Sequence, residues 1–237
     1  MNLTAMMEPF DSFWEAPEDI EKGFSTFSKF YKANYLKYIP ENMESSILAL
    51  SCGPGYFVSL LKGKGYTNVL GIDSDPEKVK YTETRGLNCQ VENGFDFLEK
   101  NQKQFDVIIA EQEVNHLTIE EMFTFLKLCK QNLKKDGILI VHSLNGANPI
   151  TGTESLAQNI DHYNTLTEYS LKQILEYADF KEIKIIPLNL YVFYNNPFNY
   201  VAIFLERLNT LIFKFNFKLY GKSNKIFTKK IAGICKK

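Results

Sequence analysis

The sequence predicts an α/β fold in which a mostly parallel, Rossmann-like sheet carries helices on both faces. From Ile47 onward, short apolar runs alternate with longer segments of helical period, which is typical of parallel strands joined by helices. Several runs are apolar at every position, as expected for strands covered on both sides. The turn Lys134-Lys135-Asp136-Gly137 joins one helical segment to the next apolar run. Together these features favour a doubly covered sheet.

Each apolar run between turn residues is assigned to a strand, and each segment with apolar residues every three or four positions to a helix. The expected strands are Ile47–Leu50, Asn68–Ile72, Gln90–Glu92, Phe105–Ala110, Ile138–His142, Ile183–Pro187 and Ile231–Cys235. The expected helices between them are Tyr56–Lys64, Pro76–Thr84, Phe95–Lys100, Ile119–Leu133 and Thr167–Ala178.

Residues 1–44 mix aromatic and charged side chains at helical spacing and close near Pro40, which predicts a helical segment ahead of the main domain at 45–237. Trp14 and Tyr31 belong to this aromatic set. One interpretation makes the segment a lid over a ligand site. The other is that the aromatic residues pin the helices to the core, where aromatic side chains contribute much of the buried area.

Residues 143–166 are polar and follow the carboxyl end of a predicted strand. Ligands of open α/β sheets bind at that edge, so we expect a substrate loop, with an inert surface loop as the alternative. Residues 197–222 carry apolar side chains at helical spacing with basic residues among them, which predicts an amphipathic helix inserted before the last strand. Such a helix can pack on its own domain, on a second subunit or on an anionic membrane, and packing on protein is the commonest use.

The composition excludes several classes of protein. The chain has 237 residues, 45% of them hydrophobic, and a formal net charge of -1, which indicates a soluble globular protein without a field that attracts nucleic acid. The four cysteines form no pair with metal-ligand spacing, so we expect no metal and a reduced, cytoplasmic setting. The acidic N-terminus lacks the features of a secretory signal, and no uncharged apolar run is long enough to span a membrane.

The motif Ser51-Cys52-Gly53-Pro54-Gly55 lies between a predicted strand and a predicted helix. Its glycines let the backbone approach a ligand, although Val58 replaces the third glycine of a dinucleotide fingerprint. Asp73 ends the next strand, the position from which an acid reaches a ribose diol. Its alternative role, capping the following helix, is better met by Ser74 or Asp75. The pattern therefore indicates a nucleoside-binding site.

The chain resembles the class I S-adenosylmethionine-dependent methyltransferases over residues 45–190. The matching segments are the glycine loop, Gly71-Ile72-Asp73, Phe105–Ala110 and Leu133–Val141, in the order of the family. The resemblance implies a seven-stranded sheet with an antiparallel last strand. The chain departs from the family at Ala49 and Ser51, where an acidic residue and a glycine are usual, which puts tight donor binding in doubt.

The same resemblance implies S-adenosylmethionine as the cofactor and assigns roles to individual residues. Gly53 and Gly55 would face the amino-acid portion of the donor and Asp73 its ribose. The segment Asn93-Gly94-Phe95 falls where adenine is held, and Glu111 and Gln112 fall beside the methionyl part. The further cofactor-binding candidates are Ser51, Cys52 and Ser74.

Two short stretches are similar to a subgroup associated with sugars and polysaccharides. They are the N-terminal segment from Phe13-Trp14 to Tyr38, and Asp161-His162-Tyr163 with the following Leu166–Leu171. The similarity implies polysaccharide biosynthesis and a sugar hydroxyl as acceptor, whose proton a histidine would remove. The candidate bases are His162 and His116, and the candidate substrate and lid residues are Trp14, Tyr31, Asn145 and Tyr163.

We therefore expect a methyltransferase that acts on a small molecule or glycan, most simply by O-methylation. The alternative is a catalytically weak or silent binding or scaffold protein that keeps the methyltransferase fold, as the changes at Ala49 and Ser51 suggest. The sequence leaves open the identity of the acceptor, oxygen against nitrogen methylation, peripheral membrane contact and the oligomeric state.

Overall fold

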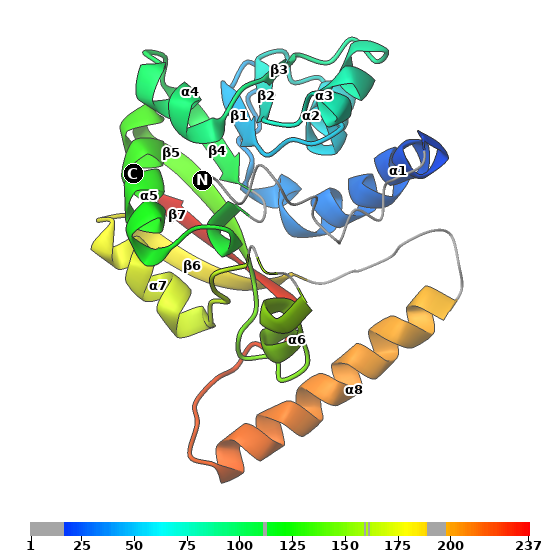
Figure 1. Cartoon of the computed structure of the whole chain (residues 1–237), viewed down its shortest axis with the longest axis vertical. Coiled ribbons are helices and arrows are strands. Elements are labelled where there is room, and N and C mark those ends of the chain that lie inside the picture. The colour runs from blue at the N-terminus through cyan, green and yellow to red at the C-terminus, as the bar shows by residue number, and fades with distance from the viewer. Residues whose placement is uncertain (1–16, 111–112, 159, 161, 189–197) are drawn as a thin grey trace.

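A computed structural model of the chain describes residues 17–110, 113–158, 160, 162–188 and 198–237. Its centre is a seven-stranded sheet of order β3-β2-β1-β4-β5-β7-β6 (Figure 1). The strands are β1 (Ile47–Leu50), β2 (Val69–Asp73), β3 (Cys89–Val91), β4 (Phe105–Ala110), β5 (Leu133–Leu144), β6 (Lys181–Leu188) and β7 (Lys230–Lys236). Neighbours from β3 to β5 pair in parallel, and β7 runs antiparallel to both β5 and β6. The predicted fold class is confirmed.

The α-helices are α1 (Pro17–Asn34), α2 (Tyr56–Gly63), α3 (Pro76–Glu83), α4 (Gly94–Lys100), α5 (Ile119–Asn132), α6 (Thr151–Gln158), α7 (Glu168–Tyr177) and α8 (Phe198–Leu219). Short 3-10 helices, η2 (Leu36–Tyr38) and η3 (Glu113–Asn115), complete the set. Several of these helices begin where their capping residues predict. Asp75 caps α3, and Thr118 forms a capping box with Glu121 at the start of α5.

The structure differs from the expected elements at two places. Strand β5 begins at Leu133 rather than Ile138, because Leu133 pairs with Phe105 and a bulge carries the strand through the expected turn. Asp136 within the bulge has a left-handed φ of 62°. The expected 143–166 loop contains the helix α6. The amides of Ile150, just before this helix, and of Thr151, its first residue, donate hydrogen bonds to the side chain of Asn148.

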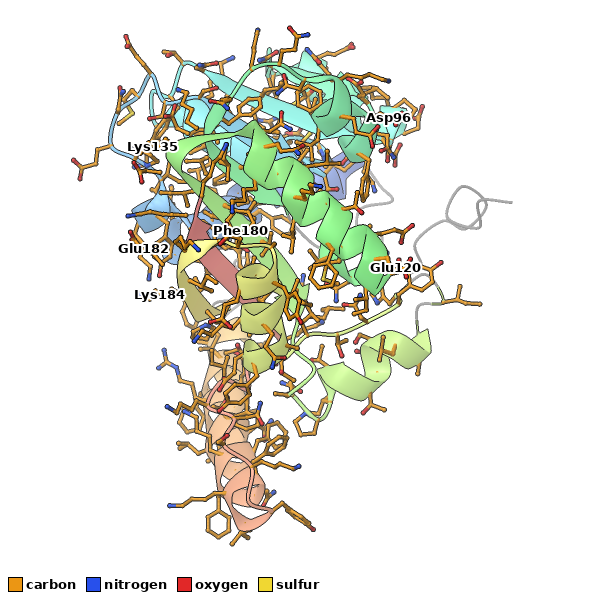
Figure 2. The ribbon with its side chains drawn as sticks, turned by 90° about the vertical axis from the view of Figure 1, so that its left-hand side faces the viewer. Asp96, Glu120, Lys135, Phe180, Glu182 and Lys184 are labelled. Atoms are coloured by element: carbon orange, nitrogen blue, oxygen red, sulfur yellow. The ribbon has the colours of Figure 1, made fainter. Side chains whose placement is uncertain are left out.

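Helices cover the sheet on both faces and form two hydrophobic clusters. One cluster joins the sheet to α4, α5 and α7, and the other joins it to α1 and α2. Figure 2 shows Asp96 and Glu120, in the first turns of α4 and α5, on the side of the molecule opposite to Lys135, near the start of β5. The carboxyl ends of the parallel strands therefore meet at one edge, together with the helix N-termini.

Helix α1 is attached to the domain by aromatic packing. The Phe27 ring stacks on Tyr56 of α2 at 4.9 Å between centroids, and Phe24 meets the same ring edge-on at 4.8 Å. Tyr31 lies against Phe57 at 4.8 Å and is buried. These contacts match the interpretation in which the aromatic residues fix the N-terminal helix to the core.

A buried hydrogen bond joins the segment after α1 to the middle of the sheet. The Tyr35 hydroxyl lies 2.8 Å from Nδ1 of His142 on β5, and both side chains are buried. Burial holds the pKa of His142 well below its usual range, and the nearby Lys230 lowers it further. His142 is therefore neutral in the folded protein at neutral pH.

The connection from β1 to α2 reverses direction through three residues of left-handed backbone. They are Ser51 with φ 54°, Gly53 with φ 52° and Gly55 with φ 83°. Glycine adopts this conformation freely, whereas a residue with a Cβ is strained by about 1–2 kcal/mol. Ser51 therefore has the backbone shape of the glycine that the family has at this position, at a cost in stability.

The strain at Ser51 predicts that Ser51→Gly stabilises the protein. Relief of the left-handed strain exceeds the extra chain entropy of glycine in the unfolded state, so we expect a gain of about 0.5–1 kcal/mol in the free energy of unfolding. Urea titration measures it. Ser59→Gly, inside α2, is the matched control and should lose about 0.5 kcal/mol. A Ser51→Gly protein no more stable than the wild type would contradict the strain.

The neutral, buried His142 predicts a specific pH dependence of stability. Because its folded pKa is lowered, its contribution is complete above the unfolded pKa of about 6.5 and is lost as the pH falls below that value. We expect the wild type to lose about 1 kcal/mol more than His142→Gln between pH 6.5 and 5.5. Chemical denaturation at both pH values provides the measurement. Equal losses in the two proteins would show that His142 protonates in place.

Candidate functional site

The parallel strands bring the predicted site residues to one edge of the sheet. Residues that follow β1, β2, β3, β4 and β5 all lie at the carboxyl ends of neighbouring strands, because the pairing from β3 to β5 is parallel throughout. The glycine loop follows β1 in the centre of this row. This edge is where open α/β sheets bind their ligands.

Asp73 ties two of these strand ends together. Its Oδ2 accepts a hydrogen bond from the Gly53 amide at 2.7 Å, and its Oδ1 accepts from the Asp75 amide at 2.9 Å. A carboxylate offers about four acceptor positions, so capacity remains for two further donors such as a ribose diol. Ser74 lies between these residues in the same turn. The carboxylate therefore holds the glycine loop in place and still suits the predicted ligand.

Two cysteines meet beneath the glycine loop. A Cβ on Gly71 would lie 2.8 Å from Sγ of Cys52 and 2.7 Å from Sγ of Cys89, so only glycine fits between the thiols. The hydrogen bond between these thiols raises the pKa of Cys52 and lowers that of Cys89, and burial adds to the rise at Cys52. Neither cysteine forms a disulfide bond. Sequence analysis gave no sign of this pair, because 36 residues separate its members.

The residues expected at adenine form the start of α4. The Asn93 side chain accepts from the amides of Phe95 and Asp96 and so caps the helix. The Phe95 ring packs toward Phe125 of α5 at 5.6 Å. A Cβ on Gly94 would lie 3.7 Å from Cδ2 of Leu50, an ordinary contact that places this turn beside the end of β1. Trp14, Glu111 and Gln112 lie outside the described residues.

The glycine loop is open at Gly53. A Cβ added to Gly53 would meet no atom within 4 Å, so the backbone faces open space there. In contrast, Ala49, the residue that replaces the family's acid, is 3% exposed and belongs to the cluster under α1 and α2. A carboxylate at position 49 would be buried in that cluster. The loop is therefore open on the ligand side and packed below.

The two candidate bases lie together, although 45 residues separate them in the chain. The His116 and His162 rings meet edge to face with 4.7 Å between centroids, and both side chains are half-buried. Nδ1 of His162 lies 3.0 Å from the Ser155 carbonyl, which can only accept a hydrogen bond. The proton of the neutral ring is therefore on Nδ1 and its lone pair on Nε2, the form that a general base requires.

Two asparagines hold the histidines in position. Asn115, fully buried, donates to the Asn164 carbonyl at 3.0 Å and accepts from the Leu144 amide at 3.1 Å. Asn164 donates in return to the carbonyls of Val114 and Leu117 at 3.1 and 2.6 Å. Each asparagine is a near neighbour of one histidine in sequence. The bonds therefore join the segment after β4 to the segment after α6 and fix the distance between the rings.

The remaining expected substrate residues differ in exposure. Tyr163 is 54% exposed beside His162, so its ring is accessible to a substrate. Asn145 is fully buried, and its amide donates to the carbonyls of Ile226 and Thr228 at 3.1 and 2.8 Å. Since both N–H groups are used, we assign Asn145 to the framework of the site. Tyr31 is likewise buried, in the packing between α1 and α2.

The residues that orient the candidate bases carry no signal in the sequence. Asn115, Asn164 and the Ser155 carbonyl were not predicted, because hydrogen bonds between distant segments leave no periodic signal. The Asn148-Pro149 pair was a detectable sign of α6, since an asparagine before proline often begins a helix. Within the described part of the chain, no group of three or more histidine, cysteine or acidic residues is arranged to hold a metal ion.

Solved structures of methyltransferases share this fold. An S-adenosylmethionine-dependent methyltransferase from Archaeoglobus fulgidus is 23% identical, with a TM-score of 0.66 over 92% of this chain and 97% of that one. A protein from Thermotoga maritima, described as a possible histamine N-methyltransferase, is 13% identical, with a TM-score of 0.58 over 92% and 91%. Magnesium protoporphyrin IX methyltransferase from Synechocystis, with bound SAH, is 14% identical, with a TM-score of 0.56 over 93% and 85%.

No curated protein sequence matches the chain significantly. Residues 24–185, more than half of the chain, match the family described as a methyltransferase domain. This range includes the glycine loop, Asp73 and both histidines. The chain therefore belongs to the methyltransferase domain family, which confirms its resemblance to the class I S-adenosylmethionine-dependent methyltransferases.

Proposed function

We propose that this methyltransferase moves the methyl group of S-adenosylmethionine to a hydroxyl group of a small molecule or glycan. The observation that carries the proposal is the His116–His162 pair, whose rings lie 4.7 Å apart at the ligand edge of the sheet. A hydroxyl acceptor has to lose a proton, and a histidine is the side chain best suited to take it near neutral pH. The sugar-type acceptor is supported by the sequence around Asp161-His162-Tyr163.

The cofactor-binding half of the site comes from the first three strand ends. Asp73 would accept hydrogen bonds from the ribose hydroxyls while its bond to Gly53 keeps the loop open. The backbone at Gly53 and Gly55 would face the amino-acid portion of the donor, and Asn93 to Phe95 would border adenine. Glu111 and Gln112 remain in the proposal as neighbours of the methionyl part. When bound, the donor supplies an electrophilic methyl group on a sulfonium.

The acceptor half of the site comes from the segments after β4 and α6. Nε2 of His162 would take the hydroxyl proton as the new carbon–oxygen bond forms, and the proton then passes to solvent. The Ser155 carbonyl keeps Nδ1 protonated and so holds the required lone pair on Nε2. The chief contribution of such a site is alignment of nucleophile, carbon and sulfur, which depends on the fixed positions of Asn115 and Asn164.

Besides the packing of α1 on α2, the N-terminal segment would cover the site as a lid and exclude water, with Trp14 as its proposed contact with the substrate. Tyr163 would contact the acceptor from the other side, since its ring is exposed beside His162. A dry site favours the transfer, because the positive charge of the donor disappears as the methyl group moves.

The second candidate function is a binding protein that keeps the fold without catalysis. Two observations bear on it. Ala49 stands where the family usually has an acidic residue, so no carboxylate is present there to bind the ammonium group of the donor. The alanine side chain is packed in the core. Ser51, however, adopts the left-handed backbone that the glycine of the family would adopt, so the loop keeps its shape. This second observation favours the enzyme.

The chemical class of the acceptor can be tested by whether the methylated product resists hydrolysis in mild base. Purified protein is incubated with methyl-labelled donor and a panel of free sugars, glycosides, carboxylic acids and amines. We expect label in a product that survives mild base, as a methyl ether does and a methyl ester does not. Label only in amines would contradict the hydroxyl acceptor, and donor binding without transfer to any member would favour the silent alternative.

Asp73→Ala should weaken binding of S-adenosylhomocysteine by roughly tenfold to a hundredfold. The change removes a charged acceptor for the ribose, a loss of about 1.5–3 kcal/mol. Titration calorimetry measures the affinity. Asp75→Ala is the matched control: it removes the cap of α3 and lowers stability by about 1 kcal/mol, but should leave the affinity unchanged. Wild-type affinity in Asp73→Ala would remove Asp73 from the site.

His162→Ala should lower turnover by about 10²–10⁴ while donor affinity stays near that of the wild type, because a general base acts on the transition state. Steady-state rates with the identified acceptor provide the measurement. His116→Ala tests the partner ring, and if it alone loses turnover, the two roles are exchanged. Losses of only a few-fold in both variants would rule out a histidine base and leave alignment as the source of the rate.

A further inference from the structure

Helix α8 lies outside the two hydrophobic clusters of the domain. Figure 1 shows it running along the outside of the molecule, and Figure 2 shows it extending beyond the rest of the fold. One side is turned toward the domain and is half-buried: Ile203, Glu206, Thr210, Phe213 and Phe217. Phe213 and Phe217 pack on Phe227, which precedes β7, at 6.2 and 4.7 Å between centroids. The contacts of this inner face therefore attach α8 to the domain.

The opposite side of α8 is an exposed apolar stripe. Its eight members are 45–68% exposed and recur every three or four residues: Val201, Phe204, Leu205, Leu208, Leu211, Ile212, Phe215 and Leu219. At about 100° per residue they fill one sector of roughly 120°, with no charged residue inside it. Of the three alternatives for this helix, packing on its own domain is seen for the inner face and not for the stripe in the described part of the chain. A continuous apolar surface of this kind marks an interaction site.

The charges on α8 are arranged beside the stripe. Arg207, Lys214 and Lys218 follow one another along a single edge, at spacings of seven and four residues. The acid on the helix, Glu206, lies on the inner face. Residues 198–225 contain five basic residues and one acidic residue, while the whole chain has a formal net charge of -1. The positive charge is therefore concentrated at this helix, and the remainder of the chain is acidic.

We propose that the outer face of α8 docks on an anionic lipid surface. The face needs a partner that is apolar in the middle and negative at one edge, and the boundary between acyl chains and anionic headgroups has both properties. Long basic side chains beside the stripe can reach the headgroups while their stems stay on the apolar surface. The same helix of a second copy would bring the same basic edge and no outward acid. Charge complementarity thus favours lipid.

The attachment of α8 would fix the domain on that surface. Glu168 of α7 accepts from the amides of Lys225 and Ile226 at 2.9 and 2.8 Å, and the Tyr169 hydroxyl donates to the Ser223 carbonyl at 2.8 Å. These bonds hold the chain just after the helix. Strand β6 ends and β7 begins at the carboxyl edge of the sheet, so α8 is inserted on the same edge as the glycine loop.

Docking would place α8 flat in the interface. Among the described helices none, α8 included, combines the length and apolar character needed to cross a bilayer. Tyr200 and Tyr220, 71% and 83% exposed, stand near the two ends of the stripe, and tyrosine is favoured at the headgroup level. The helix would thus contact lipid along its whole length.

Co-sedimentation with vesicles tests the proposal on the full chain without any donor present. We expect binding to vesicles with roughly 30% phosphatidylglycerol, little binding to pure phosphatidylcholine, and release as salt is raised. The variant Arg207→Gln/Lys214→Gln/Lys218→Gln should lose at least tenfold in affinity. The variant Phe204→Ser/Leu208→Ser/Phe215→Ser should lose binding to the anionic vesicles although its charge is unchanged. Circular dichroism and melting temperature check that each variant is folded.

The matched control Lys64→Gln/Lys103→Gln/Lys135→Gln removes the same charge from exposed sites away from α8 and should keep wild-type binding. Three results would overturn the proposal. They are no binding of the wild type to anionic vesicles, an equal loss in the control variant, or a dimer by light scattering that the serine variant dissociates while vesicle binding is absent. Vesicle binding is independent of methyl transfer, so either proposal can fail alone.

Discussion

The hydrogen bond from the Gly53 amide to the Asp73 carboxylate joins the ends of two neighbouring strands, and the geometry of the site depends on it. It fixes the height of the glycine loop above β1 relative to the end of β2. The same carboxylate receives the Asp75 amide, which begins the turn into α3. An acidic side chain is needed there because two backbone amides converge on it. Asp73 ends β2 at the carboxyl edge of the sheet, where open α/β sheets bind their ligands.

A second constraint acts on the segments that carry the two candidate bases. Two chain segments, after β4 and after α6, have to approach closely enough for His116 and His162 to touch. Asn115 donates to the backbone carbonyl of Asn164, and Asn164 donates to the backbone carbonyls of Val114 and Leu117. Such bonds are short and directional, so the relative position of the two rings is fixed before a substrate arrives. Preorganisation of this kind is what an in-line displacement requires.

The sequence was sufficient for elements with a periodic signal. The buried strands and the amphipathic helices were placed within a few residues, because apolar spacing reflects the layer on each side of the sheet. Helix α6 was missed since threonine, serine and glycine dominate its sequence and give no apolar period. The cysteine pair at Gly71 and the Asn115–Asn164 bonds depend on contacts between distant segments, which one sequence does not reveal. The stripe on α8 was visible, but its outward direction was not.

We propose that the histidine pair faces the methyl group of a donor held by Asp73 and the glycine loop. A crystal structure with S-adenosylhomocysteine tests it most directly, because the sulfur atom marks where the methyl group was attached. We expect the ribose hydroxyls within hydrogen-bond distance of Asp73 and a space for one acceptor hydroxyl between the sulfur and Nε2 of His162 or His116. A sulfur atom turned away from both rings, or a ribose without contact to Asp73, would contradict it.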